Sequence, residues 1–131
     1  MTKDSAQELA VARQSIFKSW SVSLQGFVSA VRTERNVGLV CAFVVLALTL
    51  SVLLQISILE WIIVILCCGL VLTTELLNTA IEAVTDLACD EKIHPFAKIA
   101  KDTASAATLV ASCTSLIIGL LIFIPKLMTL F

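Results

Sequence analysis

Four polar residues lie at helical spacing in a stretch that is otherwise suited to lipid. They occupy positions i, i+3, i+7 and i+11 and are Glu75, Asn78, Glu82 and Asp86. Residues at this spacing share one face of a helix. Acids inside a membrane-spanning helix are rare, face protein or water, and mark candidate functional sites. Two acids one turn apart also repel, so a cation, a proton or a nearby base must relieve the repulsion.

Further carboxylates are expected at the same level of the membrane. Glu34 precedes the first long uncharged stretch, and Asp102, beside Lys101, precedes the third. Magnesium favours one or two carboxylates together with phosphate oxygens and water. Lysine suits the charge of phosphate groups. The pattern therefore predicts a magnesium–nucleotide site at the inner face of the membrane.

The same acids are compatible with two other classes of protein. A small proton- or ion-conducting membrane subunit also needs acids inside a span. A non-catalytic membrane protein could use polar residues to join its helices. Neither alternative requires Glu34, Lys101 or a nucleotide. The sequence contains no GxxxxGK[ST] or GxGxxG phosphate-binding motif and no protein-kinase signature, so any ATP site must be of a different kind.

The elements that position these residues are expected to be membrane helices. The chain has 131 residues, of which 59% are hydrophobic and 15% charged, and its charges are clustered. A helix that spans the hydrocarbon core needs about 20 apolar residues. The composition predicts an all-α integral membrane protein with one domain. Its expected elements are a surface helix at about 5–31 and spans at about 36–57, 61–87 and 101–125.

The N-terminal segment and the connection between the second and third spans are expected on the cytoplasmic side. Apolar residues of 5–31 recur at helical spacing, which is typical of an amphipathic helix in the membrane interface. Eight of the nine basic residues lie before the first span or between the second and third, and only Lys126 follows the third. By the positive-inside rule, the N-terminus and the 86–102 segment face the cytoplasm. Within that segment we expect a short helix beginning at Pro95, and we interpret His94 as a surface loop residue.

Three motifs in order along the chain carry a resemblance to a known family. The sequence "ELLNTAIEAVTDL", followed by "AKDTASAATLV" and preceded by "GFVSAVRTERN", resembles the prokaryotic diacylglycerol kinase and undecaprenol kinase family. The resemblance extends from about Lys18 to the end of the chain. It implies a homotrimer of three-span subunits in the bacterial cell membrane. It also implies composite active sites between neighbouring subunits that use ATP and Mg²⁺.

The resemblance also implies roles for individual residues. Glu75 matches the catalytic base, and Glu34 and Glu82 match the magnesium-holding acids. The residues that match nucleotide contacts are Glu34, Glu82, Asp90, Glu91, Lys92, Lys101 and Asp102. The residues that match lipid contacts are Asn78, Ser105 and Lys18, with Arg13 as the alternative to Lys18.

Local departures from the family pattern bear on the lipid substrate. Gly38 stands where many members have arginine, and Val22 stands where the Gram-negative branch has tyrosine. The segments "ISILEW" and "LLIFIPKLMTLF" are similar to the Gram-positive branch, whose members are mostly undecaprenol kinases. The resemblance therefore favours transfer of the γ-phosphate of ATP to undecaprenol, which gives undecaprenyl phosphate. Diacylglycerol, which gives phosphatidic acid, is the alternative lipid.

Overall fold

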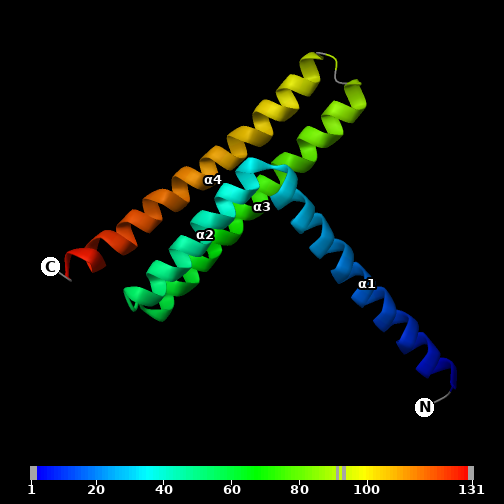
Figure 1. Ribbon diagram of the computed structural model, residues 1–131, viewed down its shortest axis with the longest axis horizontal. Coiled ribbons are helices and arrows are strands. Elements are labelled where there is room, and N and C mark those ends of the chain that lie inside the picture. Colours follow the sequence, from blue (N-terminus) through cyan, green and yellow to red (C-terminus); the bar gives the residue numbers. More distant parts are fainter. Residues whose placement is uncertain (1–2, 91, 93, 130–131) are drawn as a thin grey trace.

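The chain forms four helices joined by short connections. The computed structural model describes the backbone of residues 3–90, 92 and 94–129, and their side chains from Ser15 onward. The helices are α1 (Lys3–Thr33), α2 (Arg35–Leu53), α3 (Ile58–Cys89) and α4 (Pro95–Met128) (Figure 1). No strand occurs in this described part of the chain. The predicted all-α class is therefore confirmed.

Three of these helices are long and apolar enough to cross a membrane. Their most apolar windows have mean hydropathies of 2.4 in α2, 2.0 in α3 and 2.4 in α4. At 1.5 Å per residue, α3 is about 48 Å long and exceeds a hydrocarbon core of about 30 Å. The predicted spans at 36–57, 61–87 and 101–125 lie largely on α2, α3 and α4. How much of each helix lies in lipid remains a prediction.

The starts of α3 and α4 follow from local hydrogen bonds. Ser57 and Glu60 form a reciprocal capping box in which the Ser57 N–H donates to Glu60 Oε2 at 2.6 Å. This cap satisfies backbone donors at the N-terminus of α3. His94 caps α4, because its Nδ1 accepts a hydrogen bond from the Phe96 N–H at 3.3 Å. The cap gives this histidine a local structural role.

The short loop helix that we predicted at Pro95 is wrong, because Pro95 begins the 34-residue helix α4. Proline is favoured in the first turn of a helix, where its missing N–H has no intrahelical partner. Nothing in the residues from Pro95 to Asp102 breaks the helix, so this polar segment and the apolar run that follows it form one element. The candidate residues Lys101 and Asp102 therefore lie about two turns into α4 rather than at its start.

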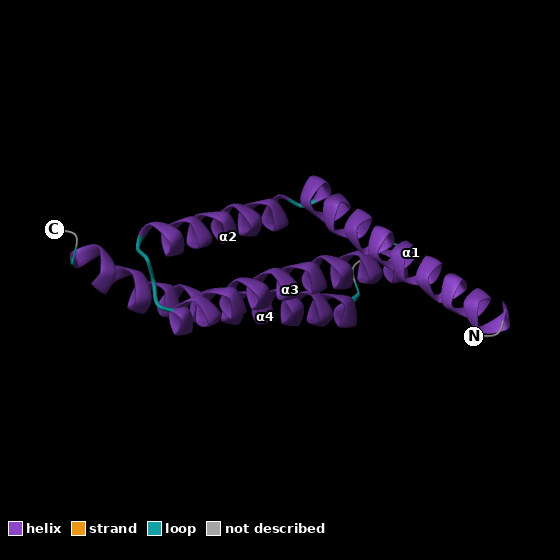
Figure 2. Cartoon of the chain, turned by 90° about the horizontal axis from the view of Figure 1, so that it is seen from below, coloured by secondary structure: helices purple, strands orange, loops and turns teal. Residues whose placement is uncertain are grey.

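Helices α2, α3 and α4 pack side by side. The α3–α4 pair is antiparallel and makes the most extensive contact, and α2 packs on α3 (Figures 1 and 2). A small core of Ile56, Val64 and Ile122 joins the three helices near the α2–α3 turn. An ion pair between Lys126 and Glu60, at 3.3 Å, joins the same end of α3 and α4. The candidate acids lie toward the opposite end of these helices.

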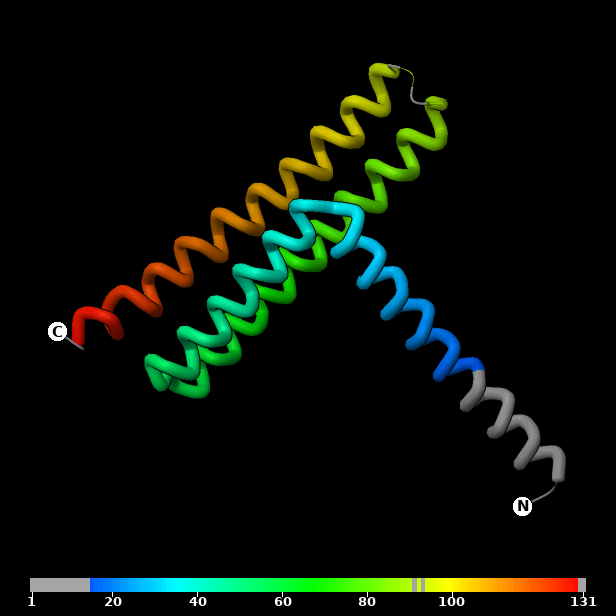
Figure 3. The backbone as a smooth tube through the Cα atoms, viewed as in Figure 1, coloured from blue at the N-terminus to red at the C-terminus, as the bar shows by residue number. Residues whose placement is uncertain are grey.

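Helix α1 leaves the bundle and packs little against the rest of the chain. The backbone bends sharply between α1 and α2, and α1 points away from the other three helices (Figure 3). Glu34 alone separates the two helices, with an extended conformation of φ −109° and ψ 114°. Large apolar side chains of α1, such as Phe17 and Trp20, are each 74% exposed. Their apolar surface is available to lipid or to another subunit.

Candidate active site

Two of the predicted site residues are among the few buried residues of the chain. Glu75 and Asn78 on α3 retain only 6% and 8% of their accessible surface. Burying polar groups costs free energy unless they are paired. Apolar side chains would pack at these positions without that cost. The burial of an acid and an amide one turn apart therefore indicates a functional site.

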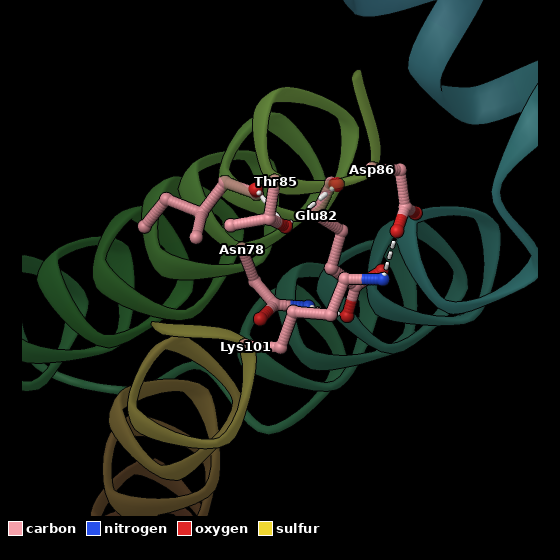
Figure 4. Close-up of polar contacts among 6 residues, drawn as sticks. Asn78, Glu82, Thr85, Asp86 and Lys101 are labelled. Carbon is pink, nitrogen blue, oxygen red and sulfur yellow. Dashed lines mark hydrogen bonds and ion pairs between the residues drawn. The ribbon is translucent and has the colours of Figure 1, made fainter. Parts of the chain in front are cut away.

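The Asn78 amide binds Glu82, the next acid of the stripe after Glu75. Its Nδ2 donates a hydrogen bond to Glu82 Oε1 at 2.9 Å (Figure 4). Its Oδ1 is buried and accepts no hydrogen bond from the part of the chain that the structure describes. Buried acceptors without a donor are uncommon. Asn78 therefore orients Glu82 through one atom and presents an acceptor through the other.

A base from α4 partly relieves the repulsion expected along the stripe. The Lys101 Nζ donates to Asp86 Oδ1 at 2.5 Å, which joins α4 to the C-terminal end of α3 (Figure 4). The negative charge of Glu82 also acts on Lys101. The sequence left three ways to relieve this repulsion: a cation, a proton or a nearby base. The structure shows a nearby base, because Lys101 binds Asp86 and its charge interacts with that of Glu82.

The buried carboxylate of Glu75 meets groups from the junction of α1 and α2. The charges of Glu82 and Glu34 both act on Glu75, and the Asn36 side chain lies beside it. Glu34 is half-buried, and its side chain forms no cap on α2. The structure therefore brings together acids that lie far apart in the sequence. Sequence reasoning missed Asn36, although an amide in the first turn of an apolar helix is a detectable signal.

An apolar cavity extends from Glu75 along the membrane helices. Its volume is about 720 Å³, and α2, α3 and α4 all contribute to its wall. Asn36 and Glu75 lie on its lining together with residues near the other end of α4, such as Phe123 and Leu127. Cavities of this size can hold a small molecule. An apolar chain with a polar head would place the head near Glu75.

Comparison with known proteins decides the family. Residues 21–123 match the family described as prokaryotic diacylglycerol kinase. The chain belongs to this kinase family. It is 44% identical to the undecaprenol kinase of Bacillus subtilis over 126 residues, which cover 96% of this chain and 98% of that protein.

Two further relatives of the kinase are named diacylglycerol kinase. The diacylglycerol kinase of Synechocystis sp. is 34% identical over 116 residues, which cover 88% of this chain and 66% of that protein. The diacylglycerol kinase of Pseudomonas aeruginosa is 40% identical over 96 residues, which cover 73% of this chain and 77% of that protein. The resemblance recognised in the sequence is confirmed.

Family membership settles the class of protein. The chain is an ATP-dependent lipid kinase, and its three apolar helices make it a membrane protein. The ion-conducting and non-catalytic interpretations of the acid stripe are set aside. The roles of individual residues in this kinase remain predictions.

The structure of the kinase gathers some of the predicted residues and separates others. The gathered residues are Glu34, Glu75, Asn78, Glu82 and Lys101. Asp102 instead pairs with Lys98 at 2.7 Å, one turn earlier on α4. Lys101 and Asp102 thus have different partners, although they are neighbours in the sequence.

The remaining predicted residues of the kinase lie away from the cavity of a single chain. Asp90 and Lys92 form an exposed ion pair at 3.2 Å beyond the end of α3. Lys18 on α1 and Ser105 on α4 are exposed and do not line the cavity. Glu91 lies outside the residues that the structure describes.

The acids of the kinase fit a magnesium site completed by a nucleotide. Within the described ranges, no three His, Cys, Asp or Glu side chains are grouped closely enough to hold a metal ion by themselves. Magnesium usually takes one or two protein carboxylates and completes its shell with phosphate oxygens and water. Glu34 and Glu82, whose charges both act on Glu75, are suited to supply those two carboxylates.

Proposed function

We propose that this kinase transfers the γ-phosphate of ATP to undecaprenol at the cytoplasmic face of the bacterial membrane. The observation that carries the proposal is the buried carboxylate of Glu75 on the wall of a long apolar cavity. A lipid alcohol needs an apolar site for its chain and a proton acceptor for its hydroxyl. The relative named undecaprenol kinase aligns with nearly the whole chain.

The proposed roles follow the requirements of phosphoryl transfer, which are mainly positioning and neutralisation of charge. Glu75 accepts the proton of the lipid hydroxyl as a general base. Lys101 places positive charge against the nucleotide. We assign Glu34 and Glu82 to a magnesium ion, which supplies neutralisation of the triphosphate when it is bound.

Other predicted residues complete the proposed contacts. We assign the buried, unpaired Oδ1 acceptor of Asn78 to a contact with the lipid. The further nucleotide contacts that we propose are Asp90, Glu91, Lys92 and Asp102. The further lipid contacts that we propose are Ser105 and Lys18.

We further propose that the kinase is a homotrimer whose active sites are shared between subunits. Much of the apolar surface of α2, α3 and α4 is exposed in the single chain. Lys18 and Ser105 are also exposed and away from the cavity, so a neighbouring copy is needed to complete their contacts. The exposed apolar residues of α1 support its placement on the membrane surface as an amphipathic helix.

The choice of undecaprenol over diacylglycerol rests on the supply of hydrogen-bond donors. Diacylglycerol has two ester carbonyls that require donors, whereas undecaprenol has only its hydroxyl. Few polar side chains line the cavity, and one of them, Ser115, already donates to the Cys67 carbonyl at 3.4 Å. In the family resemblance, Gly38 and Val22 also stand at positions where other members have donors. An unsatisfied buried polar group costs about 1–3 kcal/mol.

The kinase should therefore use undecaprenol with a kcat/KM roughly tenfold or more above that for diacylglycerol. Purified protein in one mixed micelle, supplied with both lipids and radiolabelled ATP, gives this ratio directly. Gly38→Arg is the matched variant, because a Cβ at this position would approach only the Val31 carbonyl oxygen, at 3.8 Å. This variant should raise the efficiency with diacylglycerol. Equal or reversed efficiencies in the unmodified protein would make it a diacylglycerol kinase by activity.

The topology should place the N-terminus inside and the C-terminus outside. Basic residues are retained on the cytoplasmic side, and eight of the nine in this chain lie on the same predicted side. Single cysteines introduced after Lys126 and in the α3–α4 connection, in a cysteine-free background, should react from opposite sides with an impermeant thiol reagent. Labelling of the C-terminal tail from the cytoplasm would contradict this orientation.

A further inference from the structure

One lysine lies between two acids that have different proposed tasks. Lys101 reaches across from α4 to Asp86, with 2.5 Å between Nζ and Oδ1. Glu82, one turn away from Asp86 on α3, also acts on the Lys101 charge. The Glu82 Oε1 meanwhile accepts a hydrogen bond from Asn78 at 2.9 Å. The ammonium is therefore bound to one acid and held close to the other (Figure 4).

We propose that Asp86 is a positioning residue that binds the Lys101 ammonium and so prevents it from pairing with Glu82. Glu82 then keeps its charge available for magnesium, and Lys101 stays at the mouth of the site for the nucleotide. This inference rests on the proposed function, in which Lys101 contacts the nucleotide. It adds a role for Asp86, which the sequence motifs left without one.

Competition between the two carboxylates supports this role. Ammonium groups pair with the nearest available carboxylate, and Glu82 is the neighbouring acid if Asp86 loses its charge. A Lys101–Glu82 pair would cancel the charge of an acid proposed to hold magnesium. It would also turn the lysine toward the buried part of the stripe. Either change weakens the binding of a magnesium–nucleotide complex.

Stability alone does not account for the pair. The side chains of Lys101 and Asp86 are 36% and 50% exposed. Ion pairs exposed to this extent contribute little to stability. The chain contains a second pair between the same helices, Lys126–Glu60 at 3.3 Å, far from the acid stripe. This second pair is therefore a matched control for an ion pair that only holds α3 and α4 together.

The test compares Asp86→Asn with Lys126→Gln in the purified full-length protein. We expect Asp86→Asn to raise the Kd of a non-hydrolysable ATP analogue with Mg²⁺ by about tenfold, because a charged contact is lost or redirected. The Mg²⁺ concentration needed for half-maximal binding should rise as well. Lys126→Gln should leave both values within about twofold, since rim charges far from a ligand have little effect on its binding. Direct binding, thermal midpoint and kcat are measured for each variant.

Two further variants distinguish the position of the positive charge from the presence of an ion pair between α3 and α4. Asp86→Glu keeps the carboxylate and should recover most of the nucleotide affinity. The exchange of Asp86→Lys with Lys101→Asp restores an ion pair between α3 and α4 but moves the positive charge to α3. It should leave the thermal midpoint near that of the unmodified protein and should not recover the affinity. If the exchange recovered the nucleotide affinity, an ion pair between α3 and α4 would be sufficient whichever helix carries the lysine. That result would overturn the inference.

Lys101→Met distinguishes this inference from the proposed function. Loss of affinity in Lys101→Met together with normal affinity in Asp86→Asn would overturn the role of Asp86 alone. Normal affinity in both variants would overturn the role of Asp86 and also the assignment of Lys101 to the nucleotide. Loss in both, with Lys126→Gln unchanged, is the result that we expect.

Discussion

Replacement of Glu75 by glutamine should lower lipid phosphorylation by about 10²- to 10⁴-fold, the range associated with removal of a general base. Glutamine keeps the shape of the side chain and loses the proton acceptor. Because Glu75 is buried with 6% exposure, an isosteric replacement preserves the packing of α3. Transfer of radiolabelled phosphate from ATP to undecaprenol by the purified variant measures the effect.

Two controls make the Glu75→Gln result specific. The variant should bind the ATP analogue with near-normal affinity, since the base acts on the lipid hydroxyl. Glu60→Gln makes the same substitution in the first turn of α3, within the Ser57 cap and 15 positions before Glu75 (75 − 60). It should retain most of the activity. Retention of more than roughly a tenth of the activity by Glu75→Gln would contradict its assignment as general base.

The helices and the acid stripe could be predicted because they depend on local sequence. Long apolar runs specify membrane helices whatever surrounds them. The spacing of Glu75, Asn78 and Glu82 places them on one face of any regular helix. The structure confirms a helix through all three and buries the first two. We could predict them as candidate site residues because placing polar side chains in a membrane costs free energy.

Contacts between helices could not be predicted in the same way. The pairing of Lys101 with Asp86, and the approach of Asn36 to Glu75, depend on how α2 and α4 lie against α3. Hydrophobic runs fix the length of a helix and leave its rotation and crossing angle to side-chain packing. The family resemblance implied that Lys101 and Asp102 both contact the nucleotide. The geometry adds a pairing of Asp102 with a neighbour on its own helix, Lys98, and leaves its role toward the nucleotide a prediction.

Glu34→Ala and Glu82→Ala should each lower kcat/KM by about 10²-fold, the scale associated with loss of one preorganised electrostatic contact. The two residues are 48 positions apart (82 − 34) and belong to the α1–α2 junction and α3. Both carboxylates nevertheless lie near enough to Glu75 for their charges to act on it, which supports their assignment to one site. Each variant should also require more Mg²⁺ for binding of the ATP analogue. This binding measurement is independent of turnover.

A double-mutant cycle tests whether the two acids share one ion. If both carboxylates hold the same Mg²⁺, the first substitution removes most of what the second could remove, and the free-energy losses in the double variant are not additive. Glu60 provides the control cycle, because it lies on α3 with Glu82 but at the opposite end of the helix. Losses for Glu60→Ala and Glu82→Ala should add to within about 0.5 kcal/mol, as expected for distant sites. Additive losses in the Glu34–Glu82 cycle, equal to those of the control, would show that the two acids act on separate ligands. Glu34 would then serve the nucleotide or the lipid without contributing to the magnesium site.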